Sequence, residues 1–151
     1  MRSRRQEASE EAATEFLARF RGSVVSSVWF SDHRVMYLEV GNRLPAQQAE
    51  NHPKHEKHIF PGYNWIIRQS VGDPIERRHS GSDRLAEDLL VDRQVASVLV
   101  SGAFELVVHL DSGTIIESVS DREEDPDWDL RDGHEYLGVS AGSFQFETGR
   151  P

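Results

Sequence analysis

The chain has 151 residues, a net charge of −9 and no cysteine. Without cysteine it can form neither a disulfide nor a thiolate metal site, and the negative charge disfavours nucleic-acid binding, because phosphate contacts need a basic surface. No apolar run reaches the roughly 18 residues of a membrane span. The basic first residues are not followed by the apolar run that a secretory signal needs. We therefore expect a cytoplasmic protein with no membrane contact.

Residues 6–21 are predicted to form an amphipathic helix. Their apolar side chains recur three and four positions apart, Ser9 can cap the N-terminus, and Gly22 can end the helix in a left-handed conformation. A second, shorter helix is predicted at 84–91, where Asp83 can serve as the cap and the three leucines are expected to be buried.

Strand-like runs rich in β-branched and aromatic residues fill much of the remaining chain. They lie at 23–30, 34–40, 63–68, 94–100, 104–110, 114–120, 136–139 and 143–147. Residues 44–62 contain three prolines and no regular pattern, so we expect the least regular segment there, with at most a helical turn at 46–50. The glycines at 102, 113, 138 and 142 are expected in turns.

Positions 25–40 match positions 95–110 without gaps, at a spacing of 70 residues. The matched residues include Val25, Ser27, Val28 and Ser31 with Val95, Ser97, Val98 and Ser101. Such periodicity predicts one β-unit used twice. We therefore expect an α+β, sheet-dominated single domain over 1–151, made of two pseudo-repeated antiparallel meanders at about 22–70 and 83–151, with a helix before the first and a short helix between them.

Acidic residues are concentrated between positions 121 and 135, where eight of them stand against two arginines. A surface of one sign speeds and orients encounter with a partner of the opposite sign, so a cationic protein partner is favoured; a solvated loop is the alternative. Trp128 is of the residue type that dominates binding hot spots. The candidate partner-binding residues are Asp125, Asp127, Trp128, Asp129 and Glu135.

Three histidines at 52, 55 and 58 are the weak candidates for a metal site. The zinc-protease pattern H-E-x-x-H is absent, and the prolines and lysines around them are typical of an exposed loop. The aspartates at 125, 127 and 129 resemble the start of a calcium loop, but that loop needs glycine and glutamate where Leu130 and Tyr136 stand. We therefore expect no cofactor, with His52, His55 and His58 kept as the metal alternative.

Residues 138–142 match the G-x-S-x-G pattern of serine hydrolases. That chemistry needs the serine on a turn from a strand into a helix, followed along the chain by an acid and a histidine. The segment after Ser140 alternates as a strand does, and no aspartate or histidine follows it. A hairpin turn is the better explanation, and we expect no enzyme activity from this motif.

The second half resembles a broad group of small β-rich bacterial proteins. The residues that carry the resemblance, within 63–148, are Trp65, Leu89, Leu90, Val95, Ser97, Val98, Val100, Leu106, Val108, Leu110, Gly113, Thr114, Trp128, Leu130, Tyr136, Leu137 and Gly142. Members of this group are often immunity or accessory proteins of bacterial toxin systems, so the resemblance implies an immunity protein.

Three functional hypotheses follow from the sequence. The first is a non-catalytic binding protein, in its sharpest form an immunity-type protein that masks a cationic toxin through an acidic surface. The second is a metal-assisted enzyme that uses the histidine-bearing loop. The third is a structural module that associates with itself through exposed strand edges.

Overall fold

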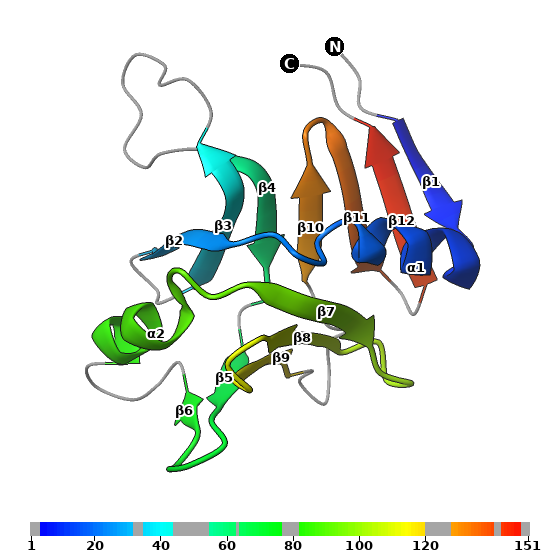
Figure 1. The fold of residues 1–151 in the computed structure, drawn as a ribbon. Coiled ribbons are helices and arrows are strands. Elements are labelled where there is room, and N and C mark those ends of the chain that lie inside the picture. The colour runs from blue at the N-terminus through cyan, green and yellow to red at the C-terminus, as the bar shows by residue number, and fades with distance from the viewer. Residues whose placement is uncertain are drawn as a thin grey trace.

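The computed structural model describes residues 4–31, 35–43, 55–62, 64–76, 82–119, 128–140 and 143–148. Over this part of the chain the fold is sheet-dominated, with two helices and two antiparallel sheets (Figure 1). The helices are α1 (Glu10–Ala18) and α2 (Ser82–Leu90). No helix of these residues is long and apolar enough to cross a membrane.

The larger sheet combines strands from both ends of the chain. Its order is β1 (Arg4–Ala8), β12 (Ser143–Thr148), β11 (Glu135–Ser140), β10 (Asp129–Asp132), β4 (His55–Phe60), β3 (Met36–Arg43) and β2 (Val25–Phe30). The smaller sheet has the order β6 (Ile75–Glu76), β5 (Trp65–Arg68), β9 (Ile115–Ser118), β8 (Leu106–Leu110) and β7 (Val95–Val100). Each sheet therefore contains strands from both stretches, 22–70 and 83–151, and neither stretch forms a sheet by itself.

One hydrophobic core contains residues of both sheets and both helices. Neighbouring strands of each sheet place buried side chains in register. These rows are Val28, Leu38, Ile59, Leu130 and Leu137 in the larger sheet and Val98, Val108, Ile116, Ile67 and Ile75 in the smaller one. Burying each such side chain contributes about 1.5–3 kcal/mol to folding. Helix α1 packs against β7 of the smaller sheet, and helix α2 packs against β2 of the larger sheet.

The hairpins β2–β3 and β7–β8 have registers that differ by 70 residues at every pair. Val25 pairs with Val40 and Val95 with Leu110, and in both hairpins the register shifts after this first pair. The backbone bonds of the two connections also correspond, because the Ser31 amide donates to a carbonyl four residues on at 3.0 Å and the Ser101 amide does so at 2.9 Å.

The first helix is shorter than the sequence predicts. The Ser9 side chain accepts a hydrogen bond from the Ala12 amide at 3.1 Å, which confirms the cap and starts the helix at residue 10. Residues 4–8 instead form strand β1, whose pairing with β12 outweighs the helical pattern that extends back to residue 6. The helix ends at residue 18, and Gly22 has a φ of +85° in the turn that follows.

Four strands of the described residues lie where the sequence predicts none, namely β1, β4, β6 and β10. Strand β4 lies within the segment expected to be irregular, and it forms because β3 and β10 pair with its two edges. Strand β10 lies in the acidic segment, and Gly138 is in strand β11 instead of a turn. Helix α2 begins at Ser82, so Asp83 is inside the helix and not, as the sequence predicts, before it. The helical turn expected at 46–50 falls outside the described residues.

Candidate protein-binding groove

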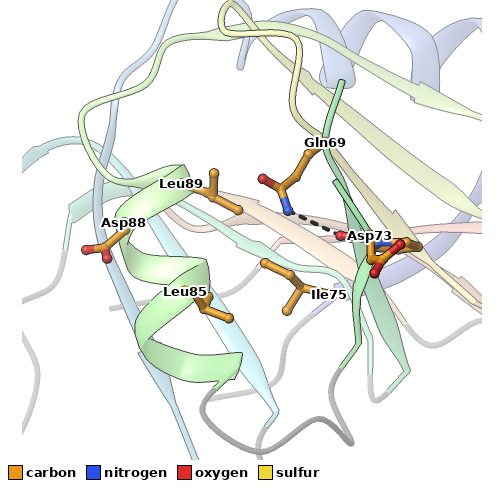
Figure 2. A pocket seen from close by; sticks show the side chains of 7 residues that line it. Gln69, Asp73, Ile75, Leu85, Asp88 and Leu89 are labelled. Carbon is orange, nitrogen blue, oxygen red and sulfur yellow. Dashed lines mark hydrogen bonds between the residues drawn. The ribbon is translucent and has the colours of Figure 1, made fainter. Parts of the chain in front are cut away.

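A groove of about 420 Å³ lies between α2 and the segment that leads into β6. Figure 2 shows leucines from the helix facing Ile75 of β6 across it. The lining residues are Gln69, Asp73, Pro74, Ile75, Leu85, Asp88 and Leu89.

The floor of the groove exists because α2 carries more apolar surface than its neighbours cover. Ala86 and Leu90 are fully buried in the core. Leu85 is 53% exposed and Leu89 is only partly buried, so both present apolar surface to the groove. The expectation that all three leucines of this helix are buried is wrong for Leu85, because this side chain lines the groove.

The borders of the groove carry oxygen atoms. Figure 2 shows Asp88 on the helix side and Asp73 on the opposite side, with the apolar side chains between them. The Gln69 side chain donates its Nε2 to the Asp73 carbonyl at 3.2 Å, which fixes the turn where Gly72 has a φ of +102°. Both aspartates are exposed, and none of the seven lining residues is positively charged. The groove therefore suits an apolar segment that also brings hydrogen-bond donors or positive charge.

The candidate partner-binding residues do not form one patch within the described residues. Trp128 is 1% exposed, and its Nε1 donates to the Phe104 carbonyl at 2.7 Å, so its indole belongs to the core. Asp129 is half-buried in β10. Glu135 pairs with Arg19. Asp125 and Asp127 lie outside the described residues.

Arg19 ties α1 to the tip of the β10–β11 hairpin. Its Nη1 lies 2.6 Å from Glu135 Oε2 and 3.4 Å from Asp132 Oδ2. The hydrogen bond to Glu135 raises the pKa of the Arg19 guanidinium, partial burial acts in the opposite direction, and the charge of Glu135 and then Asp132 adds to the rise. Asp132 was not a candidate in the sequence; it is brought into this contact by β10.

Of the three candidate histidines, the structure describes the side chain of His58. His58 Nδ1 lies 2.5 Å from Glu39 Oε2, and Glu39 is buried, so the pair joins β4 to β3. His52 and the side chain of His55 lie outside the described residues. Where the structure describes the side chains, no group of three potential metal ligands occurs. Ser140 of the G-x-S-x-G motif pairs with Ser143 across a strand–strand connection, as the hairpin interpretation predicts.

No family model, no curated protein and no solved structure matches the chain.

Proposed function

We propose that the protein is a non-catalytic binding protein and that its partner is a cationic protein. The observation that carries this proposal is the groove, whose apolar floor is bordered by Asp73 and Asp88 and which has no cationic side chain among the described residues that line it. Apolar contact supplies affinity at such a surface, whereas opposite charge supplies orientation and rate.

The charge of the whole chain supports the same partner. A net charge of −9 on 151 residues attracts a basic protein over roughly a Debye length, about 8–10 Å at physiological salt. The acidic segment with Asp125 and Asp127 supplies much of this charge. In its sharpest form the proposal is an immunity-type protein that masks a basic toxin, in line with the sequence resemblance.

Affinity capture from the native host tests this function. The immobilised chain is expected to retain a basic protein that elutes as salt is raised. The double variant Asp73→Lys/Asp88→Lys should lose it, whereas Glu15→Lys/Glu87→Lys, which makes the same change of charge at two exposed helical positions outside the groove, should keep most of it. Retention of no basic protein, or equal loss in both double variants, contradicts the proposal.

A second candidate is self-association through the outer face of the smaller sheet. Leu99 of the edge strand β7 is 53% exposed, and it pairs across the strands with the half-buried Val107. Exposed apolar side chains on an edge strand favour pairing with another chain. Light scattering over a concentration series tests this, since Leu99→Lys should abolish any dimer, and a monomer at every concentration excludes it.

We also propose that the two halves are one β-unit used twice. The backbone bonds at the junction of the halves support this, since the Gly22 amide donates to Val95 and the Asp92 amide to Val25, each at 2.8 Å and each shifted by 70 residues. The contacts of α1 with β7 and of α2 with β2 are also related by the repeat. In this arrangement each unit gives its last strands to the other sheet, so that β5 and β6 correspond to β10 and β11.

A further inference from the structure

Under the proposed repeat, the groove between β6 and α2 corresponds to the position between β11 and α1 in the larger sheet, which strand β12 occupies. There β12 pairs with β11, and its Phe146 packs edge-on against Phe16 of α1, with ring centroids 5.8 Å apart. The counterpart of β11 is β6, which is one of the two edge strands of the smaller sheet. No other strand of the described residues pairs with the outer side of β6, and the groove lies between this strand and α2.

The charged residues at the groove differ from those at the corresponding position beside β11, where Arg19 contributes a guanidinium. The buried rows equate Leu130 with Ile67 and Leu137 with Ile75. Two residues after the first pair, Asp132 corresponds to Gln69, and two residues before the second pair, Glu135 corresponds to Asp73. The spacing of 70 residues makes Leu89 the counterpart of Arg19. All three counterparts line the groove. Among the described residues it therefore keeps a carboxylate at the position of Glu135, has an amide at the position of Asp132 and lacks the guanidinium of Arg19.

We propose that the groove receives an extended basic segment of the partner, which adds to β6 as β12 adds to β11. The segment packs an apolar side chain on Leu85 and Leu89, as Phe146 packs on α1, and places an arginine beside Asp73, as Arg19 stands beside Glu135. Strand addition supplies backbone hydrogen bonds and alternate side chains supply specificity, and a guanidinium matches a carboxylate in geometry. The inference rests on the proposed function for the cationic partner and specifies the form in which it binds.

A labelled peptide in which arginine alternates with valine and phenylalanine tests this inference by fluorescence anisotropy. Two matched peptides serve as controls, one with glutamate in place of arginine and one with N-methyl groups on the backbone amides of alternate residues. The parent peptide should bind, and N-methylation of the amides that face β6 should weaken it about tenfold, since it removes strand pairing and keeps the charge. Equal binding of the parent and N-methylated peptides overturns the inference.

Variants of the full chain locate the contact. Leu89→Arg supplies the guanidinium within the chain, and it should weaken the parent peptide about tenfold. Asp73→Asn should weaken it severalfold, whereas Glu87→Gln, an exposed acid on α2 outside the lining, should leave it unchanged. Unchanged affinity in both Leu89→Arg and Asp73→Asn, or a wild-type dimer that Leu89→Arg dissociates, contradicts the proposed occupant.

The two proposals fail in different ways. If a basic host protein is captured equally by the wild type and by Leu89→Arg, strand addition at β6 is wrong and the binding function stands. If the peptide responds to N-methylation and to Leu89→Arg as expected but no basic host protein is captured, the groove contact stands and the cationic partner is wrong.

Discussion

Trp128→Phe separates a core role of this tryptophan from a role as a surface anchor. The indole is 1% exposed, and its Nε1 bond to the Phe104 carbonyl is 2.7 Å long. Removing the donor forfeits about 0.5–1.5 kcal/mol of hydrogen bonding, or about 1–3 kcal/mol where the carbonyl is left unsatisfied. The smaller ring also leaves a gap beside Phe144, whose ring centroid is 6.4 Å from that of Trp128. We expect a loss of about 2–4 kcal/mol in the free energy of unfolding.

Urea denaturation followed by circular dichroism measures this loss. Tyr136→Phe is the control, because it removes one polar group from an aromatic ring that is only half-buried, where the hydroxyl accepts a 3.2 Å hydrogen bond from Arg131. The control should cost at most about 1 kcal/mol. Trp128→Phe should leave peptide binding at the groove unchanged. If it lowers peptide affinity and leaves stability intact, the core assignment of Trp128 is refuted.

Three further predictions concern single positions. Gly22→Ala should destabilise the protein by about 1 kcal/mol, because the φ of +85° strains any L-residue. Gly102→Ala, where the added Cβ meets equally open space, should be neutral or slightly stabilising. Equal urea midpoints of the two variants would contradict this. Ser9→Ala should cost about 1 kcal/mol through the lost cap, measured by thermal unfolding, and no change would rule the cap out. Arg19→Gln should cost less than about 1 kcal/mol, since the pair is partly exposed, and the cost should shrink in high salt. Because the pKa of Arg19 is raised, its contribution is present below the unfolded-state pKa and is lost only as pH rises through the folded-state pKa, so the cost should not vary between about pH 6 and 9.

The strands that the sequence predicts are those with a local apolar pattern. Strand β8 alternates buried and half-buried residues, and both β7 and β8 form close to their expected bounds. Strand β4 has only Ile59 and Phe60 as apolar residues, and β10 has only Leu130. These two strands form because they pair with each other, and β4 also with β3 and β10 with β11. That information is in the topology and not in the local composition.

The groove depends on the same non-local information. Asp73 and Asp88 lie far apart in the sequence, and neither belongs to the acidic segment at 121–135. One signal was present, since α2 carries leucines at 85, 89 and 90 beside Ala86, which is more apolar surface than one packed face needs. Trp128 could not be assigned to the core or the surface from sequence, because its burial requires the loop of the β7–β8 hairpin to supply an acceptor.

The most direct test of the account is an amide chemical-shift titration of isotope-labelled protein with the arginine-containing peptide. The proposed contact predicts that the perturbed amides cluster at 69–76 and 85–89, around the groove and the edge of β6, and that Leu89→Arg removes these perturbations. Perturbations confined to the larger sheet, with those two segments unchanged at saturating peptide, would contradict it.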